Sequence, residues 1–295
     1  MGKQTNAVNA LKALLDTDVI LTMPCCYDAF SAKLIEQADF SLTFMSGFSV
    51  AASRLGLPDT GLISYEEMID QGRNICNAVD IPVFGDADTG YGNALNVKRT
   101  VEGYIQTGFA GLMIEDQVSP KRCGHTQGKE VIDRAKAIQR LSAAIEAREE
   151  ARSHGDDIVI IARTDARATL GLEEAIERAR IFGDLGADIL FVEAPQSVSE
   201  LETIGRHIEG IKMANLVEHG RTPLLSPAAL QQMGFKIAAY PLTLLSSAAH
   251  AMLNALAMLK QGQGPTQILD FQHLQAIVGF PEYNATLERL EPETP

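Results

Sequence analysis

The sequence has few basic residues, few cysteines and no long apolar run. Its 295 residues include 25 Lys and Arg against 38 Asp and Glu, which gives a formal net charge of −13 and a pI near 4.9. This surplus of negative charge argues against nucleic acid or an anionic membrane as a partner. An anionic substrate would need local positive charge, so we expect a metal ion or buried Arg and Lys wherever such a substrate binds.

Membrane segments and disulfides are not predicted either. No apolar run approaches the roughly 18 residues of a membrane-spanning helix, and the N-terminal stretch lacks the basic and apolar regions of a secretion signal. The cysteines do not have the spacing of a zinc site, and in a chain of this size we expect reduced thiols. They are Cys25, Cys26, Cys76 and Cys123. We therefore expect a soluble, cytoplasmic protein.

The sequence does contain a β-α unit that is repeated along most of its length. Short apolar runs alternate with helical patterns, and a helix over residues 1–17 precedes them. The runs are residues 19–23, 42–45, 83–85, 111–114, 158–162, 189–192, 211–214 and 237–239. Pro24 is expected to end the first strand, and Asp28 to cap the helix after it. Eight such units predict an α/β fold, a (β/α)8 TIM barrel, which needs roughly 250 residues.

Beyond the last predicted strand the chain continues for longer than a barrel requires. Residues 244–260 form a helical pattern that is apolar nearly all round, which is typical of a helix buried on several sides. No boundary divides the chain, so we predict one barrel domain over residues 1–295, with residues 244–295 as a C-terminal helical extension. A subunit interface is a natural place to bury this helix.

A polar or ionisable residue follows nearly every apolar run. In a closed barrel the C-terminal ends of the strands share one face, so these residues converge although they are far apart in the sequence. They are Ser46, Asp86, Glu115, Arg163, Glu193 and Asn215. The pattern predicts a functional site at this face.

Two carboxylates, Asp86 and Asp88, stand one residue apart where the third strand ends. Both can turn toward one point, and their repulsion must then be relieved by a hard cation or a shared proton. A solvated turn is the alternative interpretation of this pair by itself. Because the pair belongs to the convergent set, we predict that it binds a divalent metal.

The loop after the fourth strand places Cys123 beside Lys121, Arg122 and His125. Such neighbours stabilise a thiolate, so we expect Cys123 to have a lowered pKa and to exchange a proton near neutral pH. A loop cysteine is more often inert than catalytic. Its position on the same face as the carboxylates favours the catalytic role.

The runs Asp86–Asn93 and Lys121–His125 together resemble the isocitrate lyase/phosphoenolpyruvate mutase superfamily. The resemblance extends from about Pro24 to Tyr240, which is nearly the whole barrel. Shorter matches are Ser46-Gly47, Leu57-Pro58-Asp59, Glu115-Asp116, Ala162-Arg163-Thr164-Asp165-Ala166, Val192-Glu193-Ala194-Pro195 and Asn215. The resemblance implies a Mg²⁺-dependent enzyme, with Mn²⁺ as an alternative metal, that acts on 2-oxo or 2-hydroxy dicarboxylates. It also implies a homotetramer whose neighbouring subunits exchange the last helix.

Cys123 distinguishes two branches within this superfamily. Members that act on phosphorus–carbon bonds look like Lys-Thr-Asn-Ser at this place, whereas carbon–carbon lyases carry the Cys. The chain is thus similar to 2-methylisocitrate lyase, 2,3-dimethylmalate lyase and petal death protein. It lacks two arginines of the first of these, after Tyr240–Thr243 and around His273, and Phe44–Val50 looks more like the other two. An alkylmalate or oxaloacetate substrate is therefore favoured over 2-methylisocitrate.

The resemblance implies a role for each residue of the site. Asp86 is the expected direct ligand of Mg²⁺, while Asp88 and Glu115 hold coordinated waters. Arg163 is expected to face the oxygens of the substrate. Cys123 is expected to protonate the carbanion as general acid. The residues that set its ionisation are Lys121, His125 and Glu193.

Substrate binding is assigned to a further set of residues, partly through the backbone N–H groups of Ser46, Gly47 and Gly124. The full set is Ser46, Gly47, Phe48, Asp59, Gly124, Arg163 and Asn215. Asp59 is equally well explained as a turn residue, and Glu193 could cap a strand. Two functional alternatives also remain: a hydrolase that splits oxaloacetate into oxalate and acetate, and a barrel that binds dicarboxylates without turnover.

Overall fold

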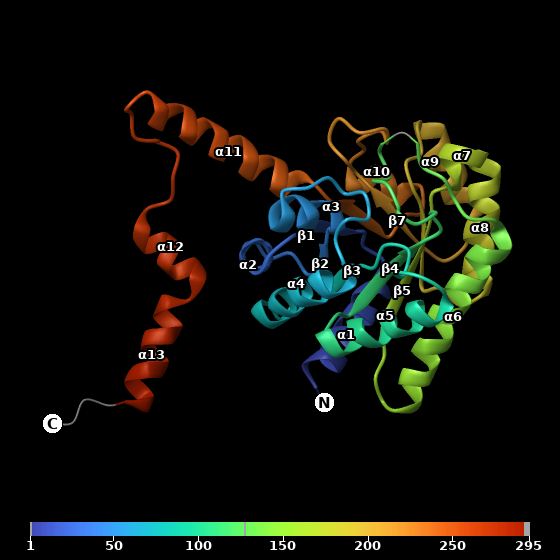
Figure 1. Ribbon diagram of the computed structural model, residues 1–295, viewed down its shortest axis with the longest axis horizontal. Helices are drawn as coiled ribbons and strands as arrows, with labels where there is room; N and C mark the ends of the chain where they lie inside the picture. The colour runs from blue at the N-terminus through green and yellow to red at the C-terminus, as the bar shows by residue number, and fades with distance from the viewer. Residues whose placement is uncertain (1, 127, 292–295) are drawn as a thin grey trace. The chain divides into compact units, whose positions relative to one another are not determined.

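Eight parallel strands form a closed barrel in the computed structural model, which describes residues 2–126 and 128–291 (Figure 1). Each strand pairs with the next in sequence, and β1 pairs with β8 to close the barrel. The strands are β1 (Leu21–Cys26), β2 (Thr43–Met45), β3 (Val83–Asp86), β4 (Gly111–Glu115), β5 (Val159–Thr164), β6 (Ile189–Val192), β7 (Ile211–Asn215) and β8 (Ile237–Tyr240). The predicted (β/α)8 barrel is confirmed.

Helices lie around the strands and between them in sequence (Figure 1). In the barrel they are α1 (Lys3–Leu15), α2 (Ala29–Gln37), α3 (Gly47–Val50), α4 (Tyr65–Ala78), α5 (Ala94–Thr107), α6 (Arg134–Ser153), α7 (Ala166–Leu170), α8 (Leu172–Asp184), α9 (Val198–His207) and α10 (Pro227–Gln232). A π-helical turn over Ala51–Leu55 follows α3. The Asp28 carboxylate accepts a hydrogen bond from the Ser31 N–H, which confirms the predicted cap of α2.

The strands are covered on both faces, so the barrel has two apolar cores. One core fills the interior, where side chains such as Met23, Phe84 and Ile161 meet. Leu11 of α1 packs into this interior core, at the end of the barrel where the strands begin. The other core lies between the strands and the surrounding helices. Because α1 covers the end where the strands begin, the open polar site lies at the other end, where the strands terminate.

The first strand begins and ends later than predicted. Val19 is 64% exposed, and the strand extends through Pro24 to Cys26. A proline removes one N–H donor but keeps a backbone angle that an extended strand tolerates. The Pro24 carbonyl accepts a hydrogen bond from the Thr43 hydroxyl at 2.9 Å, and Pro24 pairs in register with Tyr240. Pro24 therefore does not end the strand.

The chain divides into two compact units, Met1–Leu244 and Leu245–Pro295, and the second is described separately. It contains most of α11 (Thr243–Lys260), together with α12 (Phe271–Val278) and α13 (Phe280–Leu290). The helix predicted over residues 244–260 is thus present, but no residue of α11 is buried in the isolated chain. Its burial between subunits stays a prediction. In the described part of the chain, no helix has the length and hydropathy needed to cross a bilayer.

Candidate active site

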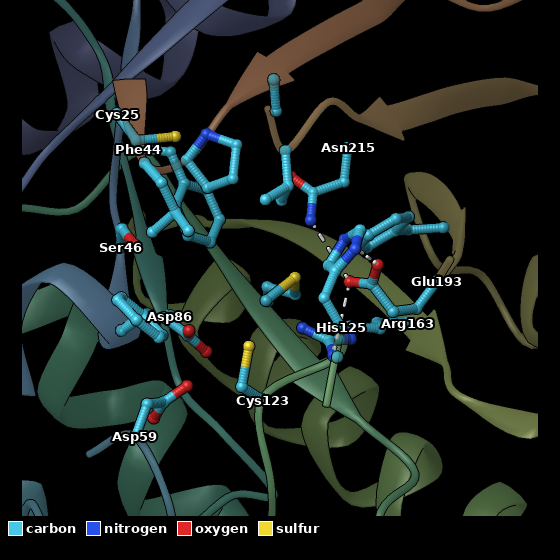
Figure 2. A pocket seen from close by; sticks show the side chains of 18 of the residues that line it. Cys25, Phe44, Ser46, Asp59, Asp86, Cys123, His125, Arg163, Glu193 and Asn215 are labelled. Atoms are coloured by element: carbon cyan, nitrogen blue, oxygen red, sulfur yellow. Dashed lines mark hydrogen bonds and ion pairs between the residues drawn. The ribbon is translucent and has the colours of Figure 1, made fainter. Parts of the chain in front are cut away.

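A cavity lies at the end of the barrel where the strands terminate, and the predicted residues line it (Figure 2). The strand ends bring together Asp86, Arg163 and Asn215, as expected for a parallel barrel. The other predicted residues that line the cavity are Ser46, Phe48, Asp59, Lys121, Cys123, Gly124, His125 and Glu193. The remaining three do not line the cavity but contact residues that do: Gly47 contacts Asp86, Asp88 contacts Lys121, and Glu115 contacts Arg163.

Asp86 ends β3 and faces the cavity without a basic partner. Its Oδ2 accepts a hydrogen bond from the Gly47 N–H at 3.2 Å, and its Oδ1 accepts one from the Asp88 N–H at 3.1 Å. A Cβ on Gly47 would lie 2.5 Å from Asp86 Oδ2, so this close approach requires glycine. Among the described residues, no Lys or Arg forms an ion pair with Asp86. Asp86 therefore lacks a direct ion pair in the described chain, although the Lys121 ammonium acts on it at longer range.

Lys121 lies between two other buried carboxylates. Its Nζ is 2.6 Å from Asp59 Oδ1 and 2.8 Å from Asp88 Oδ1. Burial raises the pKa of Asp88 to about 6, although the Lys121 ammonium opposes this change. Burial acts in the other direction on Lys121, but the surrounding carboxylates keep its pKa well above the ordinary value. Asp59 is thus part of the site rather than a simple turn residue, and Lys121 is engaged with acids.

Glu115 ends β4 and is the most deeply buried of the predicted metal-site acids. Its Oε2 lies 3.2 Å from Nε of Arg163, while its Oε1 is buried without a hydrogen-bond partner in the described chain. Burial raises the pKa of Glu115 well above its ordinary value. An orphaned buried carboxylate oxygen is unfavourable unless a cation, a proton or water satisfies it.

The residues present fit a hard divalent cation that keeps much of its hydration. Their donor atoms are carboxylate oxygens, the ligand type that Mg²⁺ prefers. Within residues 2–126 and 128–291, no three His, Cys, Asp or Glu residues are arranged to hold a metal directly. The expected arrangement, with Asp86 as direct ligand and Asp88 and Glu115 behind coordinated waters, stays a prediction. Mg²⁺ is commonly bound in this way, through one or two carboxylates.

Arg163 in β5 is held by three acids and has little freedom to move. Nε and Nη2 form a bidentate pair with the Asp165 carboxylate, at 2.8 and 3.0 Å. Nη2 is also 3.4 Å from Glu193 Oε2, and the guanidinium carbon lies 5.5 Å from the centre of the Phe191 ring. A fixed guanidinium in a buried mouth is suited to stabilise negative charge that develops on a substrate.

His125, Glu193 and Asn215 form a second polar group on the same side as Arg163 (Figure 2). The Arg221 N–H donates to His125 Nδ1 at 3.1 Å, which assigns the proton of a neutral ring to Nε2, 3.1 Å from Glu193 Oε1. Asn215 Nδ2 donates to Glu193 Oε2 at 3.3 Å. Burial favours a protonated Glu193, but Arg163 and His125 outweigh it and lower its pKa to about 2. Glu193 is therefore ionised.

The Cys123 thiol lies between the Asp59 and Asp86 carboxylates on one side and His125 and Arg163 on the other (Figure 2). The expected lowering of its pKa is wrong. Burial raises the pKa of Cys123 above its ordinary value, and the nearby Asp59 carboxylate adds to this effect. The basic neighbours in sequence do not compensate, because Lys121 pairs with acids and His125 faces Glu193. The thiol is thus protonated at neutral pH, which is the state that a general acid requires.

The predicted backbone donors are partly engaged within the protein. The Ser46 N–H donates to the Cys26 carbonyl at 3.0 Å and so cannot bind a carboxylate of the substrate. Ser46 Oγ accepts from the Ser49 N–H at 3.3 Å, which leaves the hydroxyl hydrogen free to donate. The Gly47 N–H contacts Asp86, as described above.

Two groups of residues in and around the site were not predicted from the sequence. The first is an apolar wall of strand residues that face the barrel interior, whose pattern signals only burial. It includes Phe44, Met113, Phe191, Met213 and Ala239. The second is Asp165 with its partner Lys129, whose Nζ lies 3.0 Å from Asp165 Oδ1. Asp165 is part of the Arg163 motif, so its spacing was a signal, whereas nothing in the sequence distinguished Lys129.

Known proteins resemble this chain over most of its length. The family described as phosphoenolpyruvate phosphomutase matches residues 11–260. The chloroplastic carboxyvinyl-carboxyphosphonate phosphorylmutase of Arabidopsis thaliana is 42% identical, over 93% of this chain and 79% of its own. The 2,3-dimethylmalate lyase of Eubacterium barkeri is 39% identical, over 95% of this chain and 93% of its own.

Solved structures agree over nearly the whole chain. Oxaloacetate acetylhydrolase in complex with the inhibitor 3,3-difluorooxalacetate has a TM-score of 0.94 and 33% identity, covering 98% of this chain and 99% of its own. Phosphonopyruvate hydrolase, solved with oxalate and Mg²⁺, has a TM-score of 0.83 and 26% identity, covering 98% and 99%. Magnesium is thus present in a related barrel.

The family match covers most of the chain, and the two relatives named above are aligned over 93% and 95% of this chain. The resemblance found in the sequence is confirmed, as is the prediction that the protein is an enzyme. The chain belongs to the phosphoenolpyruvate phosphomutase family, within the isocitrate lyase/phosphoenolpyruvate mutase superfamily.

Proposed function

We propose that the protein is a Mg²⁺-dependent carbon–carbon lyase that cleaves a small 2-hydroxy or 2-oxo dicarboxylate, with Cys123 as general acid. One observation carries the proposal: a thiol kept protonated by burial shares a cavity with Asp86 and Arg163. An acid, a metal-binding carboxylate and a fixed cation are the groups that this reaction needs. The 39% identity to a 2,3-dimethylmalate lyase supports the same reaction class.

The cavity favours a substrate with two carboxylates and apolar substituents. Lys121 and Arg163 already pair with protein acids, so little positive charge remains for a third carboxylate. Side chains such as Phe44, Met113 and Met213 form an apolar wall that suits an alkyl group. An alkylmalate therefore fits this cavity better than 2-methylisocitrate, as the sequence indicates.

Asp86 would hold the metal directly, and Asp88 and Glu115 would hold its water ligands. When bound, Mg²⁺ supplies positive charge that polarises the oxygens of the 2-hydroxy or 2-oxo acid. Mn²⁺ accepts the same oxygen ligands and is the alternative metal.

The side chains of the protein account for the other half of the reaction. With a 2-hydroxy acid, the hydroxyl proton passes to a carboxylate that lines the cavity, and the hydroxyl oxygen becomes the carbonyl of the 2-oxo acid product. The electron pair of the broken carbon–carbon bond stays on the carbon next to the second carboxylate, and this fragment becomes an enediolate. Arg163, held in place by Asp165, can balance the negative charge that grows on these oxygens. Cys123 then transfers its proton to the carbon. The His125 backbone hydrogen bond to Cys123, which favours the ionised thiol, stabilises the thiolate that remains.

A second function, hydrolysis of oxaloacetate to oxalate and acetate, is favoured by one observation. The similarity to oxaloacetate acetylhydrolase, at a TM-score of 0.94, extends over 98% of the chain. In that reaction water attacks the 2-oxo carbon, and the same Arg163 and Cys123 would serve the leaving carbanion. The two reactions differ in their products, so product analysis separates them.

We further propose that the protein is a cytoplasmic homotetramer in which the last helix is exchanged between neighbouring subunits. Helix α11 carries a row of large, exposed apolar side chains. Met252 is 58% exposed, Leu253 66%, Leu256 61% and Leu259 58%. Apolar surface of this extent is a sign of a protein interface.

The reaction is tested with a panel of substrates. The purified protein is incubated with Mg²⁺ and, separately, with 2,3-dimethylmalate, oxaloacetate, 2-methylisocitrate and phosphonopyruvate, and products are followed by NMR. We expect 2,3-dimethylmalate to yield pyruvate and propionate, with turnover abolished by a chelator and restored by Mg²⁺. Consumption of oxaloacetate alone would favour the hydrolase, and consumption of phosphonopyruvate alone would contradict both functions.

The role of Cys123 is tested on the same substrate. Cys123→Ser should lower kcat roughly 10²- to 10⁴-fold, the usual contribution of a general acid, while oxalate binding by calorimetry stays unchanged. Cys76→Ser is the matched control, because Cys76 is buried away from the cavity. Equal activity of the two variants would remove Cys123 from the mechanism.

The raised pKa of Cys123 predicts the pH dependence of kcat/KM. The thiol must be protonated to act as an acid, so activity is present below its pKa and is lost as the pH rises through it. Because burial places this pKa above the ordinary 9.0, the alkaline limb should lie above pH 9. Thiolate ultraviolet absorbance should rise over the same range in the wild type and be reduced in Cys123→Ser. A limb below the ordinary thiol value would contradict the assignment.

The assembly is tested by sedimentation equilibrium of the full chain. Leu253→Glu with Leu256→Glu should convert the tetramer to smaller species, because two charges are placed on the apolar row of α11. Leu95→Glu on the barrel helix α5 is the control, since Leu95 is 76% exposed. A wild-type monomer, or a tetramer that both variants retain, would exclude α11 as the interface.

A further inference from the structure

Lys129 is a buried lysine outside the cavity. It contacts both the loop that carries Cys123 and the Asp165 carboxylate, which pairs with Arg163. Its side chain is 2% exposed, and its Nζ lies 3.0 Å from Asp165 Oδ1. The same Nζ donates a hydrogen bond to the Gly124 carbonyl, one residue after Cys123. In the described part of the chain Lys129 does not line the cavity, so it has no access to a substrate there.

Lys129 forms its ion pair with Asp165, which is itself held by several other contacts. Its carboxylate is fully buried and forms the bidentate pair with Arg163, at 2.8 and 3.0 Å. Its backbone N–H donates to Asp116 Oδ1 at 2.9 Å, and Asp116 in turn pairs with the buried Arg178 at 3.0 Å. The Asp165 carboxylate therefore binds both cations, and its Oδ1 is shared between Arg163 and Lys129.

The contact between the loop and Arg163 is tight. A Cβ on Gly124 would lie 2.5 Å from Arg163 Nη2 and 2.6 Å from the carboxyl carbon of Glu193. The loop backbone thus rests directly on the guanidinium and on Glu193. A small displacement of Gly124 would also move the neighbouring Cys123 thiol relative to Arg163.

The Lys129 ammonium also offsets part of the negative charge around Arg163. Arg163 is surrounded by the carboxylates of Asp165, Glu115 and Glu193. Without the Lys129 ammonium this buried cluster becomes more negative by one unit of charge, next to the place where an anionic substrate and its enediolate must be held. An uncompensated charge in a buried site is strongly unfavourable.

We propose that Lys129 is a positioning residue that fixes the Cys123 loop against Arg163 by binding the Asp165 carboxylate and the Gly124 carbonyl together. It acts through Asp165 and Gly124 rather than on the substrate. The kinetic part of this inference rests on the proposed lyase function, whereas the position of the loop can be measured without any turnover.

The test uses Lys129→Met, with Lys136→Met as the matched control, because Lys136 is 71% exposed and pairs only with Asp133 among the described residues. The first readout is the rate of Cys123 alkylation by iodoacetamide, followed by mass spectrometry. The other three cysteines are buried, so Cys123 reports on its own loop. Release of the loop should raise this rate at least roughly fivefold, since local opening controls access. Lys136→Met should leave it unchanged.

The second readout is kinetic, on the substrate that the wild type consumes. Lys129→Met should lower kcat roughly 10- to 100-fold, the usual cost of misplacing a catalytic group, with a much smaller change in KM. If this variant does not fold, Lys129→Gln carries the test with the same expected direction in alkylation and kcat. It removes the charge but keeps a hydrogen-bond donor.

Unchanged alkylation of Cys123 and unchanged kcat in a folded variant would overturn the inference. So would a loss of kcat accompanied by alkylation of Cys26 and Cys76, which lie outside the cavity and would report a general structural role. Faster Cys123 alkylation in a protein whose wild type consumes no tested substrate would support the positioning role while contradicting the proposed lyase function.

Discussion

Charge balance in the mouth of the barrel is the constraint on which the site depends. Six buried carboxylates gather there, against three Lys and Arg cations. The acids are Asp59, Asp86, Asp88, Glu115, Asp165 and Glu193, and the cations are Lys121, Lys129 and Arg163. Burying negative charge without compensation is costly, so the surplus must be relieved by protons or by a cation. Burial is the main cause of the raised pKa values of Asp88 and Glu115, and neighbouring carboxylates add to it, while Asp86 remains without an ion pair among the described residues.

The barrel creates this surplus, and the loop after β4 relieves part of it. Parallel strands place Asp86, Glu115 and Arg163 at one end, whatever their distance in sequence. The loop then contributes Lys121 and Lys129, which pair with acids of the barrel and its other loops. Closing the loop over the cavity also buries the Cys123 thiol and keeps it protonated. The same arrangement thus accounts for the unpaired Asp86 carboxylate and for the protonated Cys123 thiol.

The sequence predicted the positions of side chains that depend on strand ends, but not those that depend on the path of a loop. Asp86 and Arg163 were placed correctly because the barrel topology determines which face they share. The sign of the Cys123 pKa shift was wrong, because Lys121 is a neighbour of Cys123 in sequence while its charge is engaged by Asp59 and Asp88. Lys129 had no distinguishing pattern, since its role depends on a tertiary contact with Asp165.

We propose that Asp86 binds a divalent cation that completes the charge balance of the mouth. Calorimetric titration of Mg²⁺ into the purified protein, without substrate, tests it most directly. We expect saturable binding to the wild type and loss of binding in Asp86→Asn. Asp70→Asn is the control and should bind like the wild type, because Asp70 is an exposed acid paired with Arg54. Binding that is unchanged in Asp86→Asn would contradict the account.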